Sequence, residues 1–245
     1  MSIHRVFITD SLTINQKLEL NSNASNYLAK VLRLKLGAEL VLFNGQEPLG
    51  EYYAHICSIS NRRVVVEVKR FDVVDNESPI EINLLQGISK GDRMDYTIQK
   101  SVELGVNAIY PVWMERTNVK LSDEKRLQKK HNHWQGVANS ALEQSGRVAQ
   151  VAIHQPFKFN QIESLQADLK LILDPYSNQS LASLSKQTPK QINILIGPEG
   201  GLSEQEVKQA QSIGYQGIQL GPRILRTETA SLAIISNFQY LWGDF

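Results

Sequence analysis

Residues 192–203, INILIGPEGGLS, and residues 218–230, IQLGPRILRTETA, decide how the second half of the chain is expected to fold. The first segment starts with an apolar run, which predicts a buried strand, and continues into a glycine-rich loop. Ser203 and Glu206 then have the S-x-x-E spacing of a capping box, which opens a helix. The second segment predicts another short strand and loop, followed by an apolar helix up to Trp242. Two loops at the carboxyl ends of parallel strands predict a ligand crevice between them.

These two motifs carry a family resemblance. Residues 196–203 (IGPEGGLS) and 220–230 (LGPRILRTETA) resemble the paired signature of the knotted SPOUT methyltransferases, specifically bacterial enzymes that methylate N3 of a uridine in 16S ribosomal RNA. Both motifs are ungapped, and the similarity extends over nearly the whole chain. The resemblance implies an α/β fold with a C-terminal trefoil knot, S-adenosylmethionine (SAM) bound in a bent form, and a homodimer. Composition and periodicity indicate neither the knot nor the dimer, and knots are rare among proteins.

A change of pattern near residue 72 predicts two domains, residues 1–72 and residues 73–245, within a chain of 245 residues. Short strands and one helix, over residues 24–34, predict a small, mostly β barrel in the first domain. The resemblance implies that this barrel is a PUA-like RNA-binding domain. Residues 71–79, FDVVDNESP, form a turn-rich linker, and residues 82–113 then follow a strand–helix–strand pattern. The second domain is therefore predicted to be α/β with a parallel sheet.

The charges of the chain nearly balance, with 26 Lys and Arg against 25 Asp and Glu. Any affinity for RNA must therefore come from local patches, because the chain is not basic overall. The single cysteine cannot form an internal disulfide, and no export signal is recognised. The longest apolar stretches are far shorter than the roughly 20 residues that a membrane helix needs. We expect a cytoplasmic protein that does not enter membranes.

Two basic clusters are candidate RNA-binding surfaces, one on the barrel and one in the first half of a long helix that Ser122 is predicted to open. Each cluster can instead be a set of solvated charges, and the family resemblance favours contact with RNA. Residues 143–147, EQSGR, also resemble a family motif. The predicted RNA-binding residues are Arg5, Lys30, Arg33, Lys129, Lys130 and Arg147.

A glycine loop before a helix also binds phosphate, so a nucleotide-binding enzyme is an alternative. The sequence lacks the patterns G-x-x-x-x-G-K-[ST] and G-x-G-x-x-G, and the carboxylate of Glu199 would repel an anion. A ligand that is cationic or rich in N–H donors fits better. The adenine, ribose and sulfonium groups of SAM meet that description. Residues 173–176 end another strand and are predicted to form a third wall. The predicted cofactor-binding residues are Leu173, Gly197, Pro198, Glu199, Gly200, Gly201, Leu220, Gly221, Leu225, Thr227 and Ala230.

Methylation of uracil N3 requires alignment of the two reactants and removal of the imide proton. Arg226 cannot accept a proton, but its guanidinium can stabilise negative charge that develops on a uracil oxygen. Glu228 and Glu199 are the carboxylates nearest the predicted crevice and are the candidate bases, although Glu228 can instead cap its helix. The predicted catalytic residues are therefore Arg226, Glu228 and Glu199.

Other site chemistries find little support. The five histidines form no H-E-x-x-H motif and Cys57 has no C-x-x-C partner, so no metal site is predicted. The predicted partner is 16S ribosomal RNA or the small ribosomal subunit. The alternatives are a SPOUT enzyme that methylates ribose 2'-hydroxyls or another base, and a non-catalytic RNA-binding factor for ribosome assembly.

The last helix is the candidate dimer interface. Between Ser231 and Trp242, apolar and aromatic residues cover more of the circumference than the single stripe of a surface helix. Such a helix needs two partners. We expect these to be the sheet of its own domain and, as the resemblance implies, a twofold-related copy of the chain.

Overall fold

The computed structural model describes residues 3–61, 63–119 and 123–245, and its contacts divide the chain into two units. The first unit comprises Met1–Glu77 with Leu142–Gln150, and the second comprises Ser78–Ala141 with Val151–Phe245. Sequence predicts a division into domains 1–72 and 73–245, which stays a prediction. The units defined by contacts differ from it in two respects, because the first unit extends to Glu77 and also includes residues 142–150.

The first unit is built on a five-stranded sheet with the order β1-β3-β4-β5-β2. The pair β1 and β3 is parallel, and the remaining neighbours are antiparallel. Alternate residues of β3 and β5 are buried in one apolar core, among them Leu40, Leu42, Val64 and Val66. The elements are β1 (His4–Phe7), β2 (Lys17–Glu19), α1 (Ser22–Asn26), β3 (Glu39–Phe43), β4 (Gly50–Ser60) and β5 (Arg63–Val73).

The helix predicted over residues 24–34 is shorter and less regular than expected. Asn21 caps α1 by accepting a hydrogen bond from the backbone N–H of Ala24, at 2.9 Å. The α-helix then gives way to a π-helical turn, Tyr27–Val31. Arg33 has a positive φ of 53°, a conformation that ends a helix.

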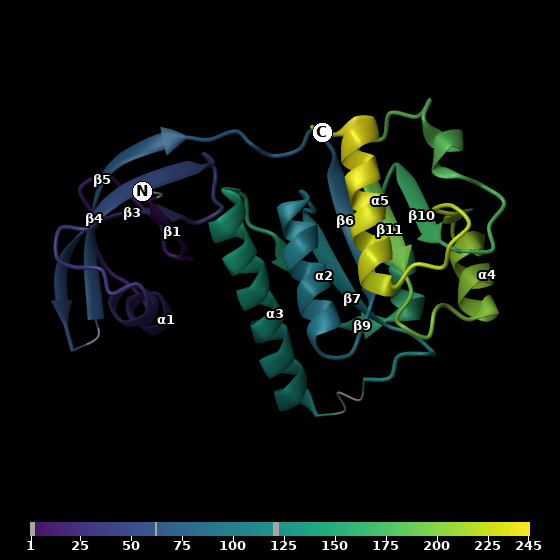
Figure 1. The fold of residues 1–245 in the computed structure, drawn as a ribbon, viewed down its shortest axis with the longest axis horizontal. Coiled ribbons are helices and arrows are strands. Elements are labelled where there is room, and N and C mark those ends of the chain that lie inside the picture. The colour runs from purple at the N-terminus through teal and green to yellow at the C-terminus, as the bar shows by residue number, and fades with distance from the viewer. Residues whose placement is uncertain (1–2, 62, 120–122) are drawn as a thin grey trace. The chain divides into compact units, whose positions relative to one another are not determined.

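The second unit is a parallel sheet with helices on both faces, which confirms the predicted α/β class (Figure 1). The strand order is β12-β10-β11-β6-β7-β8, with β9 also paired to β7. The elements are β6 (Glu81–Gly87), α2 (Asp92–Glu103), β7 (Ala108–Trp113), α3 (Glu124–Ser145), β8 (Ala152–Ile153), β9 (Phe157–Lys158), β10 (Leu169–Leu173), β11 (Gln191–Ile196), α4 (Glu204–Ser212), β12 (Gln216–Ile218) and α5 (Thr227–Trp242).

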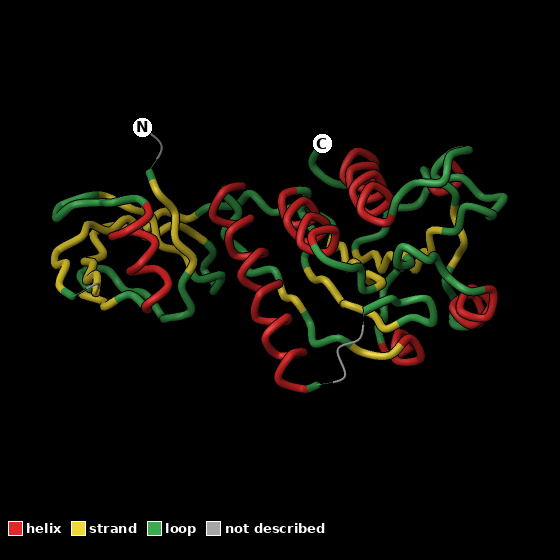
Figure 2. The backbone as a smooth tube through the Cα atoms, turned by 60° about the horizontal axis from the view of Figure 1, so that its bottom comes forward, coloured by secondary structure: helices red, strands yellow, loops and turns green. Residues whose placement is uncertain are grey.

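Helices cover both faces of this sheet, and segments far apart in the sequence lie side by side on each face (Figure 2). Helices α2 and α5 pack against each other on one face. On the other face, Leu85 and Leu195 of the sheet share a core with Phe159 and with Ala210 of α4. Residues Ile192–Ile196 of β11 are all buried, as expected for a strand covered on both faces.

The loops that follow β10, β11 and β12 leave the same edge of the sheet, because these strands are parallel. They are the three loops that sequence predicts as walls of a ligand crevice. Ser122, predicted to open the long helix, lies outside the described residues. Within the described ranges, no helix is long and apolar enough to cross a membrane.

Candidate functional site

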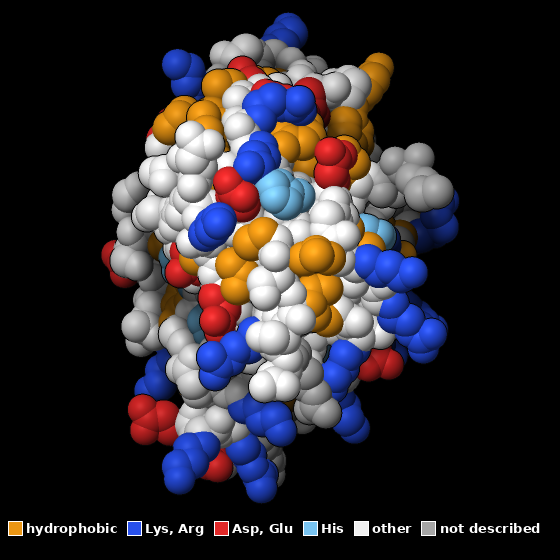
Figure 3. Space-filling view, turned by 90° about the vertical axis from the view of Figure 1, so that its left-hand side faces the viewer, with side chains coloured by type: hydrophobic (Ala, Val, Ile, Leu, Met, Phe, Trp, Pro, Cys, Tyr) orange, Lys and Arg blue, Asp and Glu red, His pale blue; other side chains and the backbone are white. Residues whose placement is uncertain are grey.

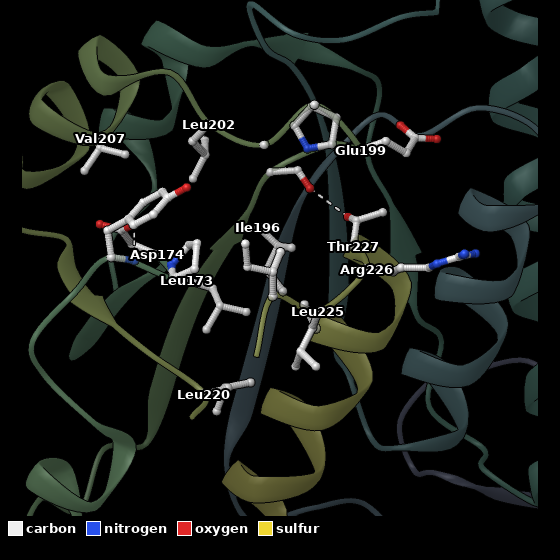
Figure 4. A pocket seen from close by; sticks show the side chains of 18 of the residues that line it. Leu173, Asp174, Ile196, Glu199, Leu202, Val207, Leu220, Leu225, Arg226 and Thr227 are labelled. Atoms are coloured by element: carbon white, nitrogen blue, oxygen red, sulfur yellow. Dashed lines mark hydrogen bonds between the residues drawn. The ribbon is translucent and has the colours of Figure 1, made fainter. Parts of the chain in front are cut away.

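A cavity of about 970 Å³ lies at the carboxyl edge of the second unit's sheet, among these three loops. It collects every residue predicted for the cofactor and for catalysis. The wall is partly apolar, with Leu173, Ile196, Leu220 and Leu225 arranged around it (Figure 4). The predicted residues that line the cavity are Leu173, Gly197, Pro198, Glu199, Gly200, Gly201, Leu220, Gly221, Leu225, Arg226, Thr227, Glu228 and Ala230.

The glycine loop is a tight turn that needs its glycines for two different reasons. The backbone N–H of Gly201 donates to the carbonyl of Pro198 at 2.8 Å. Gly201 has a φ of +70°, and a Cβ added to it would meet no atom within 4 Å. A Cβ on Gly200 would instead lie 2.8 Å from the Cβ of Arg116. Gly200 therefore allows close packing, whereas Gly201 supplies the left-handed backbone and leaves open space at the cavity.

The predicted capping box is present at the start of α4. Ser203 N–H donates to one carboxylate oxygen of Glu206 at 2.9 Å, and Glu206 N–H donates to the Ser203 hydroxyl oxygen at 3.3 Å. The other Glu206 oxygen accepts a hydrogen bond from Glu115 N–H, at 2.8 Å. Glu206 is buried, so this single carboxylate ties the start of α4 to the loop that follows β7. The third contact joins residues far apart in sequence, which spacing alone could not predict.

A side chain also links the two signature loops to each other. The hydroxyl of Thr227 donates to the carbonyl of Gly197 at 2.7 Å, a hydrogen bond between two residues that line the cavity (Figure 4). Thr227 is the first residue of α5 and is buried. The start of α5 is thus fixed against the glycine loop.

The two candidate bases have different surroundings. One oxygen of Glu199 accepts a hydrogen bond from Lys90 N–H at 2.9 Å and pairs with the guanidinium of Arg93 at 3.2 Å. These contacts tie the glycine loop to the start of α2, which favours a structural role for Glu199. The second oxygen of Glu199 and one oxygen of Glu228 are buried without a hydrogen-bond partner in the described residues. Both carboxylates can therefore accept from a ligand with N–H donors.

Arg226 is positioned as a cation available to a substrate. It precedes α5 with extended backbone, φ −65° and ψ 153°, and its side chain is exposed. Figure 4 shows the guanidinium extending away from the apolar wall formed by Leu220 and Leu225. Among the described residues it makes no ion pair, which leaves its donors free for an incoming group.

Three arginines outside the predicted site residues also line the cavity: Arg93, Arg116 and Arg223. Arg116 donates to the carbonyl of Gly200 at 3.1 Å, and Arg93 pairs with Glu199. Arg116 follows the carboxyl end of β7, where residues of a parallel sheet face a crevice, so its position was a usable signal. The position of Arg93 depends on the packing of α2 and carried no comparable signal.

Arg5 and Arg147, both predicted to bind RNA, have their charged groups engaged by residues of the first unit. Arg5 forms an ion pair with Glu51, lies 4.7 Å above the ring of Phe43, and donates to the carbonyl of Arg147 at 2.9 Å. Burial lowers the pKa of its guanidinium. Arg147 is 7% exposed and its guanidinium pairs with Glu77 at 2.5 Å. Both cations make these contacts within the first unit, where Arg147 is buried and Arg5 is half-buried.

The other four predicted RNA-binding residues keep more accessible positions. Lys30, Arg33 and Lys129 are exposed. Lys130 is half-buried, pairs with Asp95 at 3.4 Å and lies over the ring of Trp134, so part of its charge is already compensated. Figure 3 shows Lys and Arg side chains interspersed with acidic and apolar side chains on the face that it draws.

Comparison with known proteins assigns both parts of the chain. The family model described as an RNA methyltransferase domain matches residues 76–239, and the one described as an RNA methyltransferase PUA domain matches residues 20–69. The ribosomal RNA small subunit methyltransferase E of Buchnera aphidicola is 36% identical over 247 aligned positions, which cover 99% of this chain and 95% of that protein. Its namesake from Bacillus subtilis is 32% identical, with coverage of 88% and 86%.

Two solved structures are similar over the full length of the chain. A methyltransferase from Legionella pneumophila in complex with SAM has a TM-score of 0.95 and 36% identity, and covers 100% of both chains. The ribosomal RNA small subunit methyltransferase E of Neisseria gonorrhoeae, bound to SAM, has a TM-score of 0.90 and 38% identity at the same coverage. These findings confirm the PUA-like nature of the first unit. The chain therefore belongs to the family of ribosomal RNA small subunit methyltransferases E, in which a PUA domain precedes an RNA methyltransferase domain.

Proposed function

We propose that this protein transfers a methyl group from SAM to 16S ribosomal RNA, with N3 of a uridine as the accepting atom. The observation that carries the proposal is the cavity at the carboxyl edge of the sheet, which is lined by all residues of the two signature loops predicted to bind the cofactor. The relatives add support, since two similar structures contain SAM and the named relatives act on the small-subunit RNA.

The cavity suits SAM in shape and chemistry. Its volume of about 970 Å³ is at the upper end of the range for small-molecule sites. Apolar side chains offer a surface for a flat ring, and the unpartnered oxygens of Glu199 and Glu228 are acceptors for N–H donors or for positive charge. Gly201 and Gly221, with φ of +70° and +76°, let the backbone approach a ligand closely. Bound SAM supplies an electrophilic methyl group on a sulfonium.

In this proposal the protein positions the uridine and manages its proton and charge. Arg226 donates to a uracil oxygen and stabilises the negative charge that develops as N3 loses its proton. Glu228 is the better-placed acceptor for that proton, because Glu199 is occupied by Lys90 N–H and Arg93. Neither group acts alone, since most of the rate comes from holding the two reactants in a near-attack geometry.

We further propose a homodimer formed through α5. Ile234, Ile235 and Phe238 are buried in the second unit, whereas Tyr240 is 75% exposed and Leu241 half-buried. An aromatic side chain exposed beside a half-buried leucine suits an isologous interface.

The knot stays a prediction of the resemblance. It is supported by the path of the chain, which passes from β11 beyond β10 to β12 and returns to contact Gly197 through Thr227.

The decisive test combines methylation with nucleoside analysis. Purified protein is incubated with isotopically labelled SAM and either free 16S RNA or small ribosomal subunits lacking the modification, and the RNA is digested and analysed by mass spectrometry. Label in N3-methyluridine is the expected result. Label in a 2'-O-methylated nucleoside or another base would replace the proposed target atom, and SAM binding without transfer to either RNA would contradict the enzymatic role.

A further inference from the structure

Gln86 is a fully buried amide at the carboxyl end of β6, next to the strand that leads into the glycine loop. Its side chain makes three hydrogen bonds. The amide nitrogen donates to the hydroxyl oxygen of Thr227 at 2.9 Å and to the carbonyl of Gly87 at 3.1 Å. The amide oxygen accepts from the hydroxyl of Ser231 at 2.7 Å. The buried amide thus bonds to two residues of α5, Thr227 and Ser231, and these bonds fix the position of that helix.

The hydrogen bonds of Gln86 continue into the cavity wall. Thr227 has one hydroxyl proton, which it donates to the carbonyl of Gly197, so its oxygen is free to accept from Gln86. Among the described residues, the side-chain hydrogen bonds that reach the first two turns of α5 from other elements all involve Gln86 or Gly197. The start of α5 is therefore held by a short chain of bonds from β6 to the glycine loop.

We propose that Gln86 is a positioning residue for methyl transfer, a role that rests on the proposed function. It fixes Thr227, and with it the two residues on either side, Arg226 and Glu228, against the glycine loop. Among the described residues, the side chains of Arg226 and Glu228 make no hydrogen bond. The backbone at Thr227 therefore determines from which position these two side chains extend. A misplacement of about 1 Å at a reacting centre can cost about a hundredfold in rate.

The glycine loop itself has anchors that do not involve Gln86. Glu199 is held by Lys90 N–H and Arg93, and the carbonyl of Gly200 accepts from Arg116. Removal of the Gln86 amide should therefore leave most of the SAM pocket in place while α5 loses its fixed start. The proposal predicts that turnover falls more than SAM affinity.

The same strand offers a matched control for a purely structural role. Asn83 is also buried, and its amide nitrogen donates to the side-chain oxygen of Asn193 at 3.1 Å. Because Asn83 and Gln86 are three positions apart along β6, the two side chains lie on opposite faces of the sheet. Replacing Asn83 removes a buried amide of the second unit but touches neither α5 nor the glycine loop.

The experiment compares the wild type, Gln86→Met and Asn83→Leu. For each, SAM affinity is measured by calorimetry, the melting temperature by thermal unfolding, and kcat on the RNA substrate at saturating SAM. Gln86→Met should lower kcat at least about tenfold and change the SAM dissociation constant less than about threefold. Asn83→Leu should lower the melting temperature to a similar extent but keep kcat near wild type. A wild-type kcat in Gln86→Met, an equal fall of kcat and SAM affinity, or an equal loss of kcat in Asn83→Leu would overturn the proposal.

A milder pair of variants tests the same bonds if Gln86→Met does not fold. Ser231→Ala removes only a hydroxyl, which lies 2.7 Å from the amide oxygen of Gln86 and 2.9 Å from the carbonyl of Thr227, and should lower kcat about fivefold, the scale of one neutral hydrogen bond. Ser231→Thr keeps a hydroxyl and should restore it. A wild-type kcat in Ser231→Ala would overturn the positioning role. A wild-type protein that neither binds SAM nor methylates RNA would instead overturn the proposed function, and this inference with it.

Discussion

Gly201 is the residue whose replacement tests the cofactor pocket most directly. A valine there must adopt a φ near +70°, which a β-branched residue resists, and its side chain would enter the open space at the cavity. We expect Gly201→Val to fold and to lose SAM affinity at least about tenfold, measured by calorimetry. Gly214 is a matched control, because it has a φ of +92°, an equally open Cβ position, and lies at the end of α4 away from the cavity. Similar SAM affinity in Gly201→Val and Gly214→Val would contradict the pocket.

Arg226 tests the catalytic assignment. Its exposed guanidinium makes no described ion pair, so its removal should cost little stability. Arg226→Ala should lower kcat by about a hundredfold or more, the scale for one charge-stabilising donor, and leave SAM affinity near wild type. Arg226→Lys keeps the charge but not the planar fork of donors, and should recover only part of the rate. Near-normal methylation by Arg226→Ala would remove the residue from the mechanism.

These residues also mark the limit of what sequence predicts about the site. Most of the predicted cavity-lining residues are contiguous within two motifs, and identifying the two loops was therefore enough to predict them. The ion pairs of Arg5 and Arg147 could not be predicted because their partners, Glu51 and Glu77, are distant in sequence. The role of Gln86 could not be predicted for the same reason. In sequence it is only the last residue of an apolar strand, and its partner Thr227 is distant in the chain.

Among the elements, α4 depends on a carboxylate that serves two loops. Glu206 completes the capping box and also accepts from Glu115 N–H, so Glu206→Ala removes the acceptor of the buried N–H of Ser203 and of the N–H of Glu115. We expect a loss of about 1 to 3 kcal/mol in the free energy of unfolding, measured with denaturant. Glu204→Ala, an exposed change in the same first turn, is the control and should cost less than about 0.5 kcal/mol. Equal losses would show that the buried contacts of Glu206 contribute nothing.

Element prediction succeeded where a local cause decides the structure. The apolar run of β11, the glycine loop and the S-x-x-E cap each act within a few residues, and all three are where sequence placed them. The helix over residues 24–34 was only partly right, since the chain turns into a π-helical segment and then a left-handed residue, Arg33. That end depends on packing against the strands of the first unit, which no local pattern encodes.

For the whole molecule, RNA binding is expected to depend on exposed cations from both units. Arg33 and Lys129 are exposed, and each replacement by alanine should weaken binding and lower the slope of log affinity against log salt by about one unit. SAM affinity should not change, because neither residue lines the cavity. Lys186→Ala, an exposed lysine outside both predicted patches, is the control. If the double variant Arg33→Ala, Lys129→Ala kept the RNA affinity and salt slope of the wild type, both residues would be solvated charges without a role in RNA binding.

The dimer is the prediction that joins the C-terminal helix to catalysis. Because Arg226 directly precedes α5, a second copy packed on this helix would also restrain the loop that carries the guanidinium. We expect light scattering to give the mass of a dimer at micromolar concentration. Tyr240→Asp places a charge on the exposed side of α5 and should shift the mass toward monomer and reduce methylation. Val73→Asp, an equally exposed apolar position in the first unit, should leave the mass unchanged. A wild-type monomer would exclude the dimer, whereas a monomeric Tyr240→Asp with full activity would keep the interface and remove its link to turnover.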